Sequence, residues 1–126
     1  MKLSSLQIEP EPLTALTVEA GKLLAAGKFS DLAERLGYAV ALGRNPATAI
    51  QEDLRSSLAE LGDTQLDYGA EPATRVKYFK PNDNNLYAVV ECVLATTGGH
   101  GVLIELVVFG GGNEFHATLE QVSAAA

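Results

Sequence analysis

The sequence contains one cysteine, Cys92, and no tryptophan among its 126 residues. A single cysteine cannot form an internal disulfide, which excludes a small secreted domain held together by disulfides. The first residues of the chain lack the apolar stretch that a signal peptide needs. The longest apolar run, 102–109, contains Glu105 and is much shorter than the roughly 20 residues of a membrane span. These absences predict a cytoplasmic chain without a membrane-spanning segment.

Basic residues are also scarce, because 9 Lys and Arg stand against 16 Asp and Glu and give a net charge of −7. An acidic surface repels phosphate backbones and anionic lipids, so neither nucleic acid nor a membrane is an expected partner. The two histidines and the cysteine show no HxxxH or CxxC spacing, so we expect no metal and no cofactor. The one conceivable metal set combines His116 with Glu91 and Glu105. The glycine-rich segments 98–101 and 110–112 do not fit the phosphate-binding GxGxxG motif and are typical of hairpin turns.

The composition, 47% hydrophobic and 20% charged, is that of a folded protein, and the length predicts a single domain over 1–126. Residues 12–62 have helical periodicity, and residues 74–122 have the two-residue periodicity of strands. Residues 1–11 are expected to form an N-terminal arm or a first short strand. Helices followed by strands, without alternation, are typical of an α+β fold.

Apolar spacing predicts about three helices in the first half of the chain, over 13–26, 31–36 and 46–61. Ser30 and Asn45 are the expected N-caps of the second and third helices, and Gly62 follows the last turn of the third. The short apolar run 38–42 is expected to be either a strand or a continuation of the second helix.

Alternation in the second half predicts four strands, over 74–80, 86–95, 102–109 and 115–122. The connections between them are short and rich in glycine and asparagine, which favours antiparallel hairpins. We therefore predict an α+β fold in which N-terminal helices pack on a curved, four-stranded antiparallel meander.

The two faces of the predicted sheet differ in character. One face of the two central strands is wholly apolar, includes Cys92, and should pack on the helices. The other face mixes apolar side chains with one carboxylate in each strand, and a face of this kind usually packs on a partner. It predicts a homodimer through the outer sheet face, with these interface residues: Arg75, Tyr87, Val89, Glu91, Val93, Leu103, Glu105, Val107 and Phe109.

Hairpin register adds a polar row across this face. If the first hairpin turns about Asp83 and the second about Gly98, then Arg75 lies opposite Glu91, and Glu91 opposite Glu105. His116 or Thr118 would complete the row if the last glycine loop absorbed one residue as a bulge. The row is either a ladder of ion pairs at a dimer interface or a catalytic or binding carboxylate pair with raised pKa values.

The order of elements, with the segments LLAAGKFSDLAERLGYA (23–39) and FHATLEQVS (115–123), resembles the nuclear transport factor 2-like superfamily, which includes ketosteroid-isomerase-like proteins. The resemblance implies a conical half-barrel, a pocket between the curved sheet and the helices, and dimers through the outer sheet face. Its members include isomerases, dehydratases, epoxide hydrolases and non-enzymatic binding modules. The enzymes use carboxylates and tyrosines that project into the pocket.

This chain departs from the enzymes of that superfamily. Where many members carry acidic residues after the second helix, it has Tyr38-Ala39-Val40-Ala41. The expected function is therefore a non-catalytic ligand-binding or protein-interaction module, a homodimer with a possible small apolar ligand. One alternative is an isomerase- or dehydratase-type enzyme that acts on a small hydrophobic molecule through Tyr38, or through Glu91 and Glu105 if they point inward. Another is an acidic inhibitor or immunity-type protein that binds a basic partner.

Overall fold

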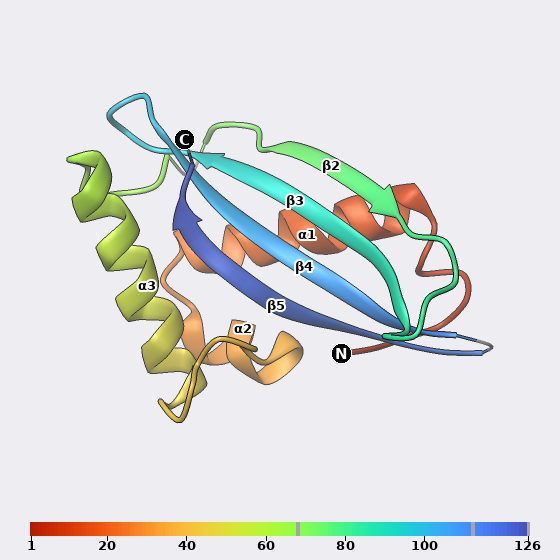
Figure 1. The fold of residues 1–126 in the computed structure, drawn as a ribbon. Coiled ribbons are helices and arrows are strands. Elements are labelled where there is room, and N and C mark those ends of the chain that lie inside the picture. Colours follow the sequence, from red (N-terminus) through yellow and green to blue (C-terminus); the bar gives the residue numbers. More distant parts are fainter. Residues whose placement is uncertain (68, 112, 126) are drawn as a thin grey trace.

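Three helices pack on a five-stranded antiparallel sheet in the computed structural model, which describes residues 1–67, 69–111 and 113–125 (Figure 1). The strand order is β1-β5-β4-β3-β2, and the sheet is not closed into a barrel. The helices precede all but one very short strand. The structure thus confirms the predicted α+β class and adds a fifth strand to the predicted four.

The helices are α1 (Pro10–Ala25), α2 (Phe29–Leu36) and α3 (Pro46–Leu61). The cap of α3 is the predicted one, because the Asn45 side chain accepts a hydrogen bond of 3.2 Å from the Thr48 N–H. The predicted cap of α2 is wrong, since Ser30 lies inside the first turn of that helix. The Lys28 N–H closes α1 by donating to the Leu23 carbonyl, and the Lys28 carbonyl already accepts the first bond of α2. The N-cap is therefore Lys28, two residues before Ser30, and the helix begins at Phe29.

The run 38–42 forms turns rather than the expected strand or helical continuation. A backbone hydrogen bond of 3.0 Å, from the Ala39 N–H to the Leu119 carbonyl, joins it to the sheet. Leu42 has a φ of +53°, outside the range of either regular structure. The segment is thus a compact loop between α2 and α3.

The strands are β1 (Lys2–Leu3), β2 (Ala73–Tyr78), β3 (Leu86–Ala95), β4 (Gly101–Gly111) and β5 (Glu114–Ala124). The last four confirm the predicted meander, with ends that differ by one or two residues. The N-terminal segment contributes β1, which pairs with β5 through Lys2 opposite His116 and Leu3 opposite Phe115. It is therefore in part a strand rather than an arm.

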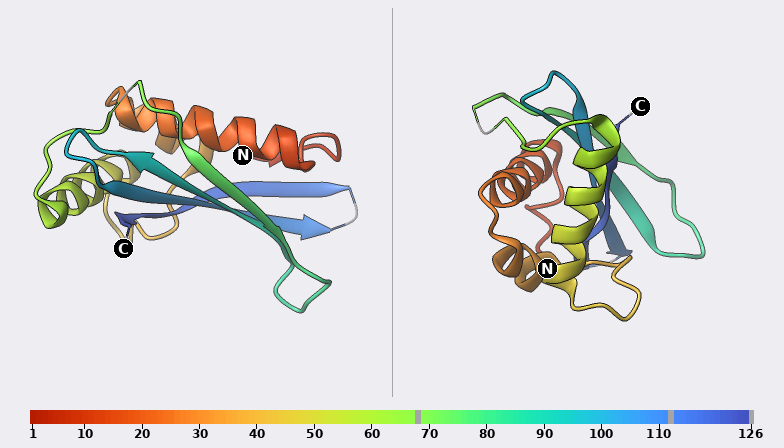
Figure 2. Two further views of the ribbon diagram at one scale, coloured as in Figure 1. Left: turned by 90° about the horizontal axis from the view of Figure 1, so that it is seen from above. Right: turned by 90° about the vertical axis from the view of Figure 1, so that its left-hand side faces the viewer.

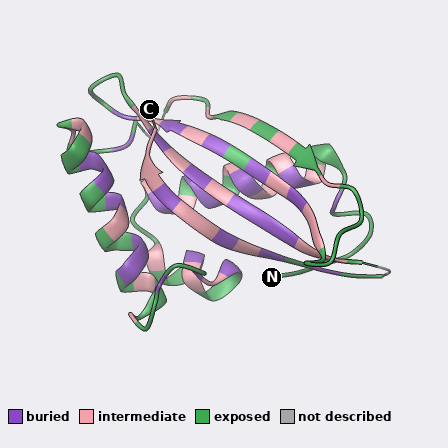
Figure 3. Cartoon of the chain, viewed as in Figure 1, coloured by how far each residue is buried: buried purple, intermediate pink, exposed green. Residues whose placement is uncertain are grey.

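The helices divide the inner face of the sheet between them. α1 contacts β2 and β3, whereas α2 and α3 contact β5 (Figures 1 and 2). Along the central strands, buried residues alternate with partly exposed ones, so one face is covered and the other is not (Figure 3). The outer face, opposite the helices, is consequently the open surface of the sheet.

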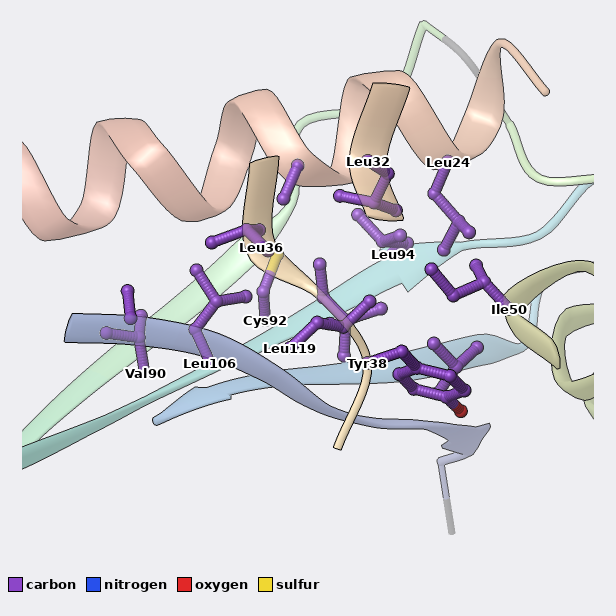
Figure 4. Packing of buried hydrophobic residues seen from close by; sticks show 14 of the residues in the cluster. Leu24, Leu32, Leu36, Tyr38, Ile50, Val90, Cys92, Leu94, Leu106 and Leu119 are labelled. Carbon is purple, nitrogen blue, oxygen red and sulfur yellow. The ribbon is translucent and has the colours of Figure 1, made fainter. Parts of the chain in front are cut away.

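The core fills the space between the helices and the sheet (Figure 4). Each helix and the central strands contribute aliphatic side chains that are at most 1% exposed: Leu13, Leu24, Leu32, Ile50, Val90, Ile104, Leu106 and Leu119. Gly21 brings α1 close to β3, because a Cβ there would stand 2.7 Å from Leu94 Cδ2. Cys92 is fully buried, and burial raises the pKa of its thiol to about 11. It is the predicted small core residue and not an accessible nucleophile.

Candidate functional site

The outer face carries the predicted polar row with one change. Arg75 lies opposite Glu91 and Glu91 opposite Glu105, as predicted. The residue opposite Glu105 is Gln121, not His116 or Thr118. The extra residue of β5 sits inside the strand, at Glu120, where the register shifts between Glu105 and Leu106. The bulge does not lie in the glycine loop, where the sequence placed it.

The bulge and the hairpin turn also determine which β4 residues lie opposite His116 and Thr118. Phe109 lies opposite His116, and Val107 opposite Thr118, so both β5 residues belong to the outer face but stand away from Glu105. His116 is exposed near the end of the strand, next to β1. Within the described residues, no group of three or more His, Cys, Asp or Glu side chains could hold a metal ion.

Most of the predicted interface residues do share the outer face. Val89, Val93, Leu103 and Phe109 are partly exposed, and Val107 is 6% exposed. The exposed Glu91 and the partly exposed Glu105 lie among them. This surface is named the outer patch, and its members are Arg75, Val89, Glu91, Val93, Leu103, Glu105, Val107 and Phe109.

Tyr87 does not belong to the outer patch, which corrects one predicted interface residue. The pairing of β3 shifts between Leu86 and Ala88, and Tyr87 packs against the core. Its ring meets Tyr78 at 5.6 Å and Phe115 at 4.9 Å between centroids, both edge to face. A strict two-residue alternation placed Tyr87 outside, whereas the irregular pairing lets its ring pack, partly buried, against the core.

The two carboxylates of the outer patch are unneutralised in the single chain. Among the described residues, no basic side-chain nitrogen lies within 4 Å of Glu91 or Glu105, so the predicted ladder is not formed within one chain. Partial burial raises the pKa of Glu105, and the negative charges of Glu91 and Glu120 raise it further. Both side chains occupy the outer face and not the space beneath the helices, where a catalytic role would have required them.

Tyr38, the other proposed catalytic residue, is part of a structural contact. Its hydroxyl donates a hydrogen bond of 2.5 Å to Asp53 Oδ2, and Arg44 Nη1 binds Asp53 Oδ1 at 2.9 Å. The Arg44 guanidinium lowers the pKa of Asp53, whereas burial and the neighbouring carboxylate raise the pKa of Tyr38. Tyr38 is 7% exposed and its ring lies in the core (Figure 4). A buried phenol with a raised pKa is poorly suited to exchange protons with a substrate.

The same arginine organises the loop between α2 and α3. Arg44 Nε donates to the Ala41 carbonyl at 2.8 Å, and Nη2 donates to the Val40 carbonyl at 2.9 Å. Together with the bond to Asp53, these contacts fasten the loop to α3. Sequence reasoning did not anticipate this contact, because only the loop conformation brings the carbonyls and the carboxylate within reach of one guanidinium.

A second polar cluster, also not anticipated, joins the end of α3 to the β3–β4 hairpin. Asp63 Oδ2 accepts bonds from the Thr96 hydroxyl at 2.6 Å and from His100 Nδ1 at 2.7 Å. The pKa of Asp63 is lowered, first by the Thr96 hydroxyl and then by His100 and the Gly98 N–H. The Asp63 side chain is 7% exposed and that of His100 is 52% exposed. We call this group the hairpin clasp: Asp63, Thr96, Gly98 and His100.

The hairpin clasp has the Asp–His bond of a general base but lacks the rest of a catalytic arrangement. The Asp63 carboxylate accepts this bond, so His100 Nδ1 is the donor. Among the described residues, no hydroxyl or thiol is hydrogen-bonded to Nε2, and the Thr96 hydroxyl is used on the same carboxylate. The arrangement is that of a brace between a helix and a hairpin.

Two hollows on the described surface can be compared with the pocket that the resemblance implies. One, of about 410 Å³, separates the tips of two hairpins and is lined in part by Phe79, Tyr87 and Phe115. Another, of about 360 Å³, lies between the end of α1 and α3, beside Leu24 and Leu58. Neither is the central pocket that the resemblance implies, because core side chains occupy that space.

In the described part of the chain, no helix has the length and apolar character to cross a membrane. Comparison with protein-family models, with curated proteins and with solved structures finds no match for this chain. The function must therefore be argued from the geometry of the outer patch and of the two polar clusters.

Proposed function

We propose that this chain is a non-catalytic protein-interaction module of the nuclear transport factor 2-like type, and that it forms a homodimer through the outer patch. The observation that carries the proposal is the character of that face. Its β3 and β4 side chains are mostly apolar and partly exposed, and two directly opposed carboxylates stand among them with no ion pair within 4 Å in the described part of the chain. Such a surface gains by being covered.

The arrangement of the core supports an interaction role over a catalytic one. The space beneath the helices holds closely packed aliphatic side chains that are at most 1% exposed, so a substrate has no room there. Tyr38 is bonded to Asp53, and Glu91 and Glu105 occupy the outer face. The groups that could carry acid–base chemistry are thus committed elsewhere or lie outside.

The proposal includes the conical shape that the resemblance implies. The order of helices and strands supports it, as do the irregular pairings in β3, next to Tyr87, and in β5, at Glu120. Bulges of this kind bend a strand and increase its twist. A sheet bent around the helices would present a convex outer face to a partner.

The test is the oligomeric state of the full chain, measured by sedimentation equilibrium over a concentration series. Wild type should be dimeric, and Leu103→Asp should be monomeric, because it puts a charge into the apolar centre of the face. Leu42→Asp is the control, since Leu42 is 86% exposed on a loop outside the outer patch. Far-UV circular dichroism checks that each variant is folded. A wild type that stays monomeric at the highest concentration contradicts the proposal.

A second candidate function is an acidic inhibitor that covers a basic protein. It rests on the net charge of −7 and on the unneutralised Glu91 and Glu105 of the outer patch. Electrostatic steering would give fast association that weakens with salt. A monomeric wild type that binds a cationic protein through this face, and loses the binding on Glu91→Lys, would favour this candidate.

A further inference from the structure

We propose that in the homodimer Arg75 of each copy forms an ion pair with Glu105 of the partner subunit. This inference rests on the proposed function, and it assigns the symmetry of the interface. It begins from a row of side chains at one level of the sheet, in which Arg75 on β2, Glu91 on β3, Glu105 on β4 and Gln121 on β5 lie side by side. The charges along the row are positive, negative, negative and neutral.

Two-fold symmetry limits how this row can meet its copy. Two sheets that pack face to face as a symmetric dimer are related by an axis that lies between them, parallel to both faces. If the axis ran across the strands at the level of the row, every residue would face itself, Glu105 against Glu105 and Arg75 against Arg75. Like charges directly opposed are unfavourable, and here all three charged residues of the row would face their own copies, so this arrangement is the least favourable on charge.

An axis that runs parallel to the strands can lie above different strands, or above the gaps between them, and each position pairs different residues. Above the gap between β3 and β4 it would place Glu91 against Glu105 of the partner subunit and bring four carboxylates together. Above the gap between β2 and β3 it would leave the apolar side chains of β4 uncovered. Above β3 it places β2 over β4 of the partner, and Arg75 then faces Glu105 of the partner subunit twice, once on each side of the axis. Glu91 meets its own copy on the axis, with Arg75 opposite it on the neighbouring strand of each copy. Of these three positions, this one both covers the β4 residues and places a cation opposite Glu105.

The local chemistry of the two groups favours the same pairing. Among the described residues, Arg75 is exposed and makes no ion pair or side-chain hydrogen bond. Lys77, the neighbouring cation on the same face of β2, lies over the Phe79 ring at 5.2 Å. Glu105 is the more buried of the two opposed carboxylates, so it is the one that most needs a cation when the face is covered. A guanidinium can bind a carboxylate with two parallel hydrogen bonds.

Charge reversal in the full chain tests the pairing, with the dimer dissociation constant from sedimentation equilibrium as the readout. Arg75→Glu should raise the constant roughly 30-fold or more, because it leaves Glu105 of the partner subunit buried beside a like charge. Glu105→Arg should weaken the dimer in the same way. The double variant Arg75→Glu/Glu105→Arg should recover most of the affinity, since the pair is restored with its charges exchanged.

Lys77 supplies the matched control. Lys77→Glu changes the net charge as much as Arg75→Glu does, on the same strand and the same face, and should weaken the dimer far less. Lys77→Glu/Glu105→Arg has the net charge of the double variant and should not recover the affinity.

Two outcomes overturn the pairing and are distinct from each other. If wild type is a dimer but Arg75→Glu behaves like Lys77→Glu, or if the charge exchange gives no recovery, then the outer patch pairs with another symmetry and the proposed function stands. If wild type is monomeric, the proposed function itself fails and the pairing fails with it. Arg75 and Lys77 are exposed on an edge strand, so Arg75→Glu and Lys77→Glu should both fold. These two variants can therefore be compared even if Glu105→Arg does not fold.

Discussion

At the scale of single residues, the hairpin clasp depends on the absence of a side chain at Gly98. A Cβ at position 98 would stand 1.8 Å from Asp63 Oδ1, far inside van der Waals contact. The carboxylate therefore occupies the space of the missing side chain, and it accepts bonds from Thr96 and His100 there. Gly98 does not have a positive φ. The position therefore requires glycine because a side chain has no room there, and not because of the backbone conformation.

Gly98→Ala should accordingly lower the free energy of unfolding by about 1–3 kcal/mol, the usual cost of inserting a group where there is no room. In the background of Asp63→Ala the same change should cost almost nothing, because the carboxylate that it displaces is gone. Urea denaturation of the four proteins in this cycle measures the coupling. Gly111→Ala is the control, since a Cβ there meets nothing within 4 Å. Equal costs in both backgrounds would show that the clash is relieved elsewhere.

At the scale of elements, β5 contains one more residue than the part of β4 with which it pairs. Leu119 lies opposite Leu106 and Gln121 opposite Glu105, so Glu120 is the residue left over. If Glu120 were absent, Leu119 and Val122, which face the core, would still alternate with Gln121, which faces outward. The bulge therefore bends the strand without changing which residues face the core.

Deletion of Glu120 should keep every strand pair and cost less than about 2 kcal/mol of unfolding free energy, whereas deletion of Thr118 should cost more than about 4. The second deletion uses up the extra residue of β5, so Leu119 moves opposite outward-facing Val107, and Glu120 moves into the core opposite Leu106. Thermal and urea unfolding compare the two proteins with wild type. A deletion of Glu120 as damaging as that of Thr118 would mean that the bulge itself is needed for packing.

At the scale of the whole molecule, two carboxylates tie the helices to the rest of the fold and make its stability depend on pH. The pKa of Asp53 is lowered by Arg44, and that of Asp63 by Thr96, from an ordinary value of 3.8. A carboxyl group with a lowered folded pKa stabilises the fold above its unfolded pKa, and this stabilisation is lost as the pH falls through the folded value.

Stability should therefore hold on acidification to about pH 4 and decline below it. Asp53→Asn should be less stable than wild type at neutral pH and approach it at the acidic end, because the variant has no such charge to lose. Urea denaturation across a pH series measures both curves. Glu19→Gln, a change at an exposed carboxylate of α1, is the control and should follow wild type. Parallel curves for Asp53→Asn and wild type would contradict the assignment.

Local signals in the sequence were sufficient for most of the fold, and distant contacts account for the differences. The Asn45 cap, the alternation of β3 and β4 and the turn residues act over a few positions, and each predicted its element. The strand β1 exists only because β5 lies beside it, and nothing in residues 1–11 alone distinguishes a strand from an arm. The structure shows a pair of opposed carboxylates on an outer face, as the register predicted, because hairpin register is fixed by nearby turn residues.

The place of β5 in the sheet has a consequence for synthesis on the ribosome. β5 is the last element of the described chain, yet β1, β4, α2 and α3 all contact it. As the chain emerges in order, α1, α2 and α3 appear before the strands that cover their apolar faces. β1 and α2 therefore lack their partner strand until β5 has been made, whereas α1 can pack on β2 and β3 earlier. β1, the first strand made, is the one that waits longest for its partner.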